Sequence, residues 1–244
     1  MMRALITLSL TAALALPLLA GCRSGDPSEA DASEPRPRPA SSYRTIARAA
    51  FNGGRYEDSI DSYEQYLRLR PTDAEARYEL GRVFLEAGRP GSAREQFTIA
   101  YESDVDNEVY IDALANALAA TGDRRATYDH VSAVATRRNT VDDFLRVADV
   151  ARRFGDVDKV EDSLLTAAAL DRGQRADVQI RLSDFYGQVG DSKRQIRRLR
   201  MAYFIDQKSE EIIERATALG EIIGPSWRIR PAEKPAPRPS NQDG

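Results

Sequence analysis

Five glycines recur at an almost constant interval through the middle of the chain. They are Gly54, Gly88, Gly122, Gly155 and Gly190, spaced 34, 34, 33 and 35 residues apart. A helical apolar pattern precedes each glycine, and another follows it. A repeat of this length with two helical segments per unit predicts a stacked array of helical hairpins. We therefore expect an all-α fold in which each hairpin packs on the next.

The second unit shows the pattern most clearly. Its three small residues would let two helices approach closely, and its three large apolar residues would fill the space between them. These are Gly81, Ala93 and Ala100, and Leu80, Phe84 and Phe97. The unit resembles the tetratricopeptide repeat (TPR) consensus at most of its signature positions and departs from it at Arg77 and Val105.

The resemblance covers about residues 40–207, because the first unit and the more divergent third to fifth units keep the same register. It implies a right-handed superhelical solenoid of about five TPR-like hairpins. A further helix is predicted after Ser209, which suits an N-cap and is followed by two glutamates. Its apolar side chains are expected to cover the open end of the array. They are Ile212, Ile213, Ala216, Leu219 and Ile223.

Prolines mark the borders of the helical block. Only Pro71 and Pro90 lie between residues 41 and 224, so this stretch is free to be helical. Residues 22–40 and 225–244 are rich in proline and poor in large apolar side chains, which predicts a disordered tether and a disordered tail. Within the tail, Trp227 either packs back on the solenoid or forms a docking motif.

The N-terminus has the pattern of a targeting signal. A short positive start precedes an apolar run over residues 4–20, which Pro17 interrupts. The run ends in Leu19-Ala20-Gly21-Cys22, which resembles the bacterial lipobox. The resemblance implies that residues 1–21 are a signal peptide and that Cys22 is lipidated. Arg23 then favours the outer membrane, facing the periplasm, and an uncleaved membrane anchor is the alternative.

The sequence offers little for catalysis. The chain has one cysteine and one histidine, His130, which excludes multi-histidine and cysteine-rich metal centres. No phosphate-binding loop or nucleophile motif is present, and a formal charge of −3 argues against a nucleic-acid binder. We expect no enzyme activity, no metal, no cofactor, no small-molecule substrate and no nucleic-acid partner.

The TPR resemblance instead points to a binding groove lined by the first helix of each hairpin. The residues expected to face it are Arg44, Arg48, Phe51, Tyr78, Arg82, Asp112, Asn116, Asp149, Arg152 and Asp184. This groove would be positive at its start and acidic further on. A merely solvated face is the alternative, and the basic stretch 193–200 and the C-terminal tail are other candidate binding surfaces.

These observations predict a non-enzymatic, membrane-anchored TPR scaffold. It would bind a protein or peptide partner in the bacterial cell envelope. Two more specific roles stay open: an assembly subunit of an outer-membrane or pilus/secretion machine, and an activator of a cell-wall enzyme. Fold resemblance does not choose between them.

Overall fold

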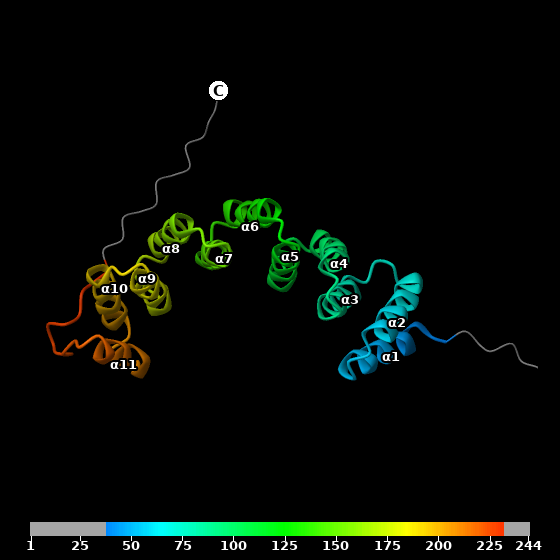
Figure 1. The fold of residues 1–244 in the computed structure, drawn as a ribbon, viewed down its shortest axis with the longest axis horizontal. Helices are drawn as coiled ribbons and strands as arrows, with labels where there is room; N and C mark the ends of the chain where they lie inside the picture. Colours follow the sequence, from blue (N-terminus) through cyan, green and yellow to red (C-terminus); the bar gives the residue numbers. More distant parts are fainter. Residues whose placement is uncertain (1–37, 232–244) are drawn as a thin grey trace, which may run out of the picture. The chain divides into compact units, whose positions relative to one another are not determined.

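The computed structural model describes residues 38–231, and that part of the chain forms eleven α-helices (Figure 1). Their bounds are α1 (Ala40–Asn52), α2 (Tyr56–Leu69), α3 (Ala74–Glu86), α4 (Pro90–Ser103), α5 (Glu108–Ala120), α6 (Arg124–Arg138), α7 (Val141–Arg153), α8 (Val157–Asp171), α9 (Ala176–Gln188), α10 (Ser192–Ile205) and α11 (Glu210–Ala218). The predicted all-α fold is confirmed.

Helices α1 to α10 form five successive hairpins, and each hairpin packs on the next one along the chain. The first helices α3, α5, α7 and α9 lie on one side of this array, and the second helices lie on the other side (Figure 1). Because the main helix–helix contacts join neighbours in the sequence, the fold is a solenoid of paired helices.

The recurring glycines close the first helix of each hairpin. All five have positive φ angles between 69° and 78°, a region that glycine enters without steric cost. In the first hairpin, the backbone N–H of Arg55 donates to the carbonyl of Ala50 at 2.9 Å. Equivalent bonds follow Gly88, Gly155 and Gly190, so the glycine repeat marks a helix-ending turn of the Schellman type.

Close packing inside a hairpin depends on a small residue of α3. A Cβ atom added at Gly81 would lie 2.6 Å from the Phe97 ring of α4. Phe97 is 1 % exposed and Ala93 is fully buried, so the ring cannot move aside without disturbing the core. The sequence prediction that small residues permit this approach is confirmed.

The third hairpin is more open than the others. Helix α5 packs more extensively on α4 than on its own partner α6. The turn also differs, because Asp123, the residue after Gly122, makes no equivalent backbone bond into α5, and Arg124 instead donates to the carbonyl of Gly122. The partly buried ring of His130 lies here, with its Nε2 atom 3.1 Å from the Ile111 carbonyl oxygen and its ring edge-on to Tyr101. It is a packing residue of the third hairpin.

The C-terminal end differs from the prediction in two respects. Ser209 caps α11 as expected, and Ile212 and Ala216 are buried, but Ile213 and Leu219 are each 37 % exposed. They lie outward because only one side of the short helix meets α10. The structure also places residues 225–231 on the solenoid, although a disordered tail was expected from residue 225.

Trp227 is the reason that this segment packs. Its side chain is 6 % exposed and lies in one apolar cluster with Leu199, Ala202, Ile212 and Ala216. Its Nε1 donates to Glu221 at 2.7 Å, and its ring lies edge-on to Tyr203. Of the two alternatives for Trp227, packing back on the solenoid is the one observed.

The signal peptide, Cys22 and the tether lie outside the described residues, apart from the tether's last three positions, 38–40. The same holds for residues 232–244. Within residues 38–231, no helix combines the length and the apolar character needed to cross a membrane.

Candidate functional site

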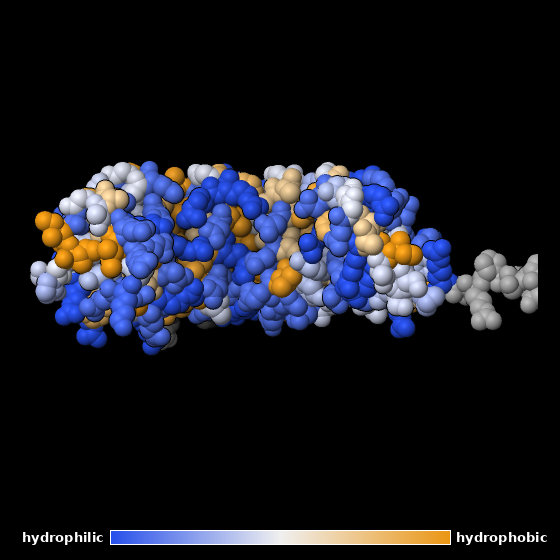
Figure 2. All heavy atoms as spheres, turned by 90° about the horizontal axis from the view of Figure 1, so that it is seen from below, coloured by the Kyte–Doolittle hydropathy of each residue, from blue (hydrophilic) through white to orange (hydrophobic). Residues whose placement is uncertain are grey.

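The candidate site is the surface of α1, α3, α5, α7 and α9 that faces away from the second helices, which we call the first-helix face. Figure 2 views the array from this side, and hydrophilic side chains cover most of it. One row of predicted site residues stands six positions before each turn glycine, the groove row. It consists of Arg48, Arg82, Asn116, Asp149 and Asp184.

Most of the groove row is bonded to the next first helix or, at the end, to α11. Arg48 donates to Glu79, Asn116 accepts from Arg153 at 3.1 Å, and Asp149 accepts from Arg181 at 2.9 Å. Asp184 accepts from Arg215. These bonds join residues 31 to 37 positions apart, so they form a ladder between hairpins.

The first rung is a cluster around Glu79. Arg44, Arg48 and Tyr63 all donate to its carboxylate. Burial works to raise the pKa of Glu79, but the hydrogen bonds from the two arginines outweigh it and lower that pKa below its ordinary value. Arg44 also pairs with Glu75, so two arginines predicted to face an open groove are neutralised by carboxylates of α3.

The acidic half of the predicted groove is also neutralised. Arg146 of α7 donates to Asp112 of α5 and also bonds Glu108 and the fully buried Asp143. In the same way, Arg181 pairs with Asp149, and Arg215 pairs with Asp184. The expectation of a groove that turns acidic is therefore wrong, because each predicted aspartate receives an arginine from the following unit.

Arg82 is the exception in the row. Its guanidinium lies 5.5 Å from the centre of the Phe51 ring and 6.0 Å from that of Tyr78. Among the described residues it has neither a carboxylate partner nor a hydrogen bond. Phe51 and Tyr78 are half-buried against the first core cluster, and Tyr78 also meets Tyr110 of α5. Phe51 and Tyr78, both predicted to face the groove, therefore also contact the guanidinium of Arg82.

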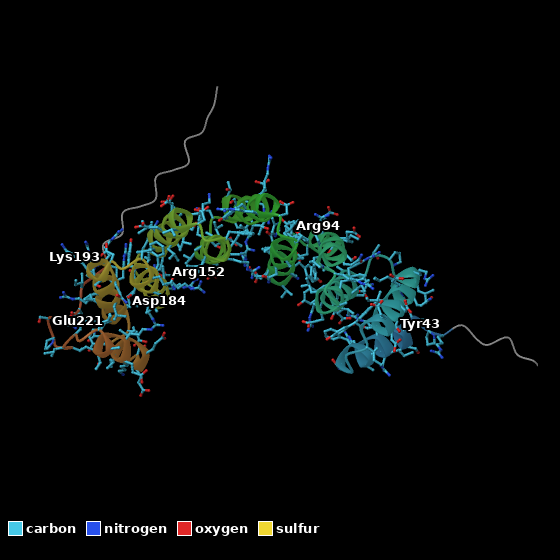
Figure 3. All side chains as sticks on the ribbon, viewed as in Figure 1. Tyr43, Arg94, Arg152, Asp184, Lys193 and Glu221 are labelled. Atoms are coloured by element: carbon cyan, nitrogen blue, oxygen red, sulfur yellow. The ribbon has the colours of Figure 1, made fainter. Side chains whose placement is uncertain are left out.

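A hollow of about 380 Å³ lies on this face between α5, α7 and α9. Ala115, Leu145 and Val150 form apolar parts of its lining. The polar lining is Asp112, Asn116, Asp142, Arg146, Asp149, Arg153, Arg175 and Arg181. Three of these were predicted to face the groove: Asp112, Asn116 and Asp149. Arg152 of α7 (Figure 3), also predicted to face the groove, is not part of this lining but pairs with Asp149.

The arginines of the hollow were not anticipated from the sequence. A signal was available, because Arg146 and Arg181 both stand nine positions before a turn glycine. In that register each could reach an aspartate on the preceding first helix. Only a comparison of the charges at equivalent positions of successive repeats would have revealed these arginine–aspartate pairs.

Comparison with known proteins agrees with this geometry. Residues 44–108 match a family model described as tetratricopeptide repeat. The solved structure of MamA protein superposes with a TM-score of 0.52 at 18 % identity, over 76 % of this chain and 98 % of that one. The fold is a TPR-like solenoid. A MamA fragment from Desulfovibrio magneticus RS-1 gives 0.51 at 14 % identity, over 70 % and 97 %.

Another similar structure is YrrB, described as a TPR protein with an unusual peptide-binding site. Its TM-score is 0.46 at 16 % identity, over 74 % of this chain and 92 % of that one. No curated protein matches the sequence. At 18 % and 14 % identity the two MamA matches establish a TPR-like fold alone, and the chemistry of the site has to be argued from its own residues.

Most of the basic side chains in residues 193–200, on the fifth hairpin, are bonded to other parts of the fold. Arg194 pairs with Asp191 and Glu161. Arg200 donates to the backbone carbonyl of Trp227 and so holds the C-terminal segment. Much of this positive charge is therefore structural. Within the described part of the chain, no group of histidine, cysteine or acidic side chains has the arrangement to hold a metal ion.

Proposed function

We propose that this TPR chain is a non-enzymatic scaffold whose first-helix face binds an extended segment of a protein partner. The observation that carries the proposal is the hollow between α5, α7 and α9, where Leu145 and Val150 lie beside exposed polar groups. Apolar floors with a few convergent polar groups are typical of binding sites.

The polar groups around the hollow suit a peptide backbone. Asn116 has an amide that can both donate and accept, and Arg153 presents several N–H donors. The ladder bonds hold these side chains in place before a partner arrives, which reduces the entropy lost on binding. The face therefore presents an ordered polar surface over an apolar base.

The scaffold is further proposed to be a lipoprotein of the cell envelope, attached through Cys22 to the outer membrane. The lipobox-like sequence before Cys22 supports this attachment. The partner's identity would decide between an assembly subunit of an outer-membrane or pilus/secretion machine and an activator of a cell-wall enzyme.

Site-specific photo-crosslinking tests the binding face. A photoreactive amino acid at position 116 or 152 should capture a partner in the native cells. The same group at position 94, on the opposite side of the array (Figure 3), or at the highly exposed position 125 should not. Equal capture from all four positions, or capture only from positions 94 and 125, would contradict the proposal.

Membrane attachment has a separate test. The wild-type chain should incorporate a fatty-acid label and sediment with membranes, whereas Cys22→Ser should do neither. An unlabelled wild-type chain in the soluble fraction would remove the envelope part of the proposal without affecting the binding face.

A further inference from the structure

The distribution of unneutralised charge on the first-helix face identifies the kind of segment it binds. At the start of the face, Arg44 and Arg48 meet three carboxylates, those of Asp73, Glu75 and Glu79. At its end, Arg215 meets both Asp184 and Glu211. Neither end has spare positive charge for an incoming ligand.

The middle of the face is different. Arg82 has no carboxylate within the described residues and is held by two aromatic rings. Arg153 is bonded to the neutral amide of Asn116 and has no carboxylate partner there either. Both side chains are exposed, so their charges are accessible to a ligand.

The neighbourhood of Arg153 adds more positive charge. Arg152 and Arg181 share one carboxylate, that of Asp149, with contacts of 3.0 and 2.9 Å. Asn116 of α5, to which Arg153 is bonded, carries no charge. Arg146 does not add to this charge, because it is only 13 % exposed and already pairs with three carboxylates, those of Glu108, Asp112 and Asp143.

From this we infer that the partner segment is an acidic, extended peptide whose carboxylates pair with Arg82 on α3 and Arg153 on α7. The inference rests on the proposed function and names the chemistry of the partner. A carboxylate at Arg82 would supply the rung that the ladder lacks between the second and third hairpins. Arginine favours such pairs because its planar donors can bind both carboxylate oxygens.

A peptide fits these observations better than a nucleic acid. The formal charge of the chain is −3, and carboxylates on both ends of the face would repel a polyphosphate backbone. The apolar floor of the hollow gives an extended peptide a place for an uncharged side chain between its acids.

The test is selection of 12-residue peptides by the purified full chain from libraries that vary acidic, amide and basic residues at each position. We expect enrichment of glutamate or aspartate at two separated positions. Arg82→Gln and Arg153→Gln should each weaken the best selected peptide about tenfold, as expected for a lost charge-assisted hydrogen bond.

The matched control is Arg94→Gln, because Arg94 has no carboxylate partner among the described residues and lies on the opposite side of the array (Figure 3). This variant should bind the peptide within twofold of wild type. All variants must keep the wild-type helical content.

Selection without acidic preference, or an unchanged affinity in the Arg82 and Arg153 variants, would overturn the inference. So would failure to select any peptide, or equal binding of a single-stranded oligonucleotide. Crosslinking from positions 116 and 152 decides the proposed function separately. If that crosslinking succeeds while acidic selection fails, only the inference about the partner's chemistry is lost.

Discussion

Arg181 on α9 donates from one nitrogen to both carboxylate oxygens of Asp149 on α7, at 3.0 and 2.9 Å. The two residues are 32 positions apart and belong to successive hairpins. The bond thus ties the fourth hairpin to the fifth on the face proposed to bind a partner. Similar bonds recur along that face, which makes its stability and its binding chemistry interdependent.

The Asp149–Arg181 pair should contribute modestly to stability. Both side chains are more than one-third exposed, so solvent and salt screen their attraction. A double-mutant cycle with Asp149→Ala and Arg181→Ala should give a coupling free energy of about 0.5 kcal/mol in urea unfolding. The coupling should shrink in 1 M salt. A coupling that salt leaves unchanged would contradict the screened geometry.

Glu79 should matter more, because its side chain is 14 % exposed and accepts from three donors. Glu79→Gln should lower the free energy of unfolding at pH 7 by about 2 kcal/mol. Glu86→Gln on the same helix is exposed and serves as the control, with an expected change near zero. Equal effects of the two substitutions in urea unfolding would show that the Glu79 cluster adds no stability.

Gly81→Ala should destabilise the protein by about 1–3 kcal/mol, because the added methyl group meets the buried Phe97 ring at 2.6 Å. Gly91→Ala in α4 is the matched control, since its added Cβ meets nothing within 4 Å. There the higher helix propensity of alanine should leave stability unchanged or raise it by up to about 1 kcal/mol. Urea unfolding measured by circular dichroism distinguishes the two outcomes.

His130 should make stability depend on pH as the pH falls from about 7.5 through the ordinary pKa of histidine, about 6.5, a range that we call the histidine window. Burial lowers its pKa in the folded state, with Arg146 and Arg137 adding to the effect and the Ile111 carbonyl and Asp112 opposing it. The neighbouring Tyr101 ring adds no charge. The unfolded chain then binds a proton more readily than the folded one, so the free energy of unfolding falls as pH drops below about 6.5. The fall ends below the folded-state pKa.

The slope of this dependence cannot exceed about 1.4 kcal/mol per pH unit for one group. Since the chain has a single histidine, His130→Gln should remove the dependence across the histidine window. The pKa values of Glu79 and Glu108 are lowered, which keeps their titration below the histidine window. A variant with the wild-type pH profile in urea titrations would rule out His130 as the source.

Trp227 should report on the C-terminal end of the solenoid alone. Trp227→Ala should detach residues 225–231 and cost that end about 3 kcal/mol, because a buried aromatic side chain is lost. As the only tryptophan, it also provides a fluorescence signal in the wild type. In a repeat array the ends can unfold first, so the fluorescence of Trp227 should change at a lower urea concentration than the circular dichroism of the helices. Coincident transitions would instead show one cooperative unit.

The sequence by itself determined the hairpin count, the helix-ending turns and the cap of α11. These follow from local rules: glycine at positive φ, small residues opposite Phe97, and serine before Glu210. The repeat register also puts Arg48, Arg82 and Asn116 at one equivalent position, six residues before a turn glycine. Local periodicity suffices because each hairpin contacts mainly its neighbours.

Only the tertiary structure decided which of those charges stay free. Arg48 and Arg82 are equivalent in the sequence, yet Arg48 is neutralised by Glu79 whereas Arg82 has two aromatic rings instead. The difference arises because an ion pair depends on a distance of a few ångströms between hairpins, which the repeat register leaves undetermined. The packing of Trp227 also depends on the tertiary structure, because the side chains of two helices, α10 and α11, must together form the apolar surface that it contacts.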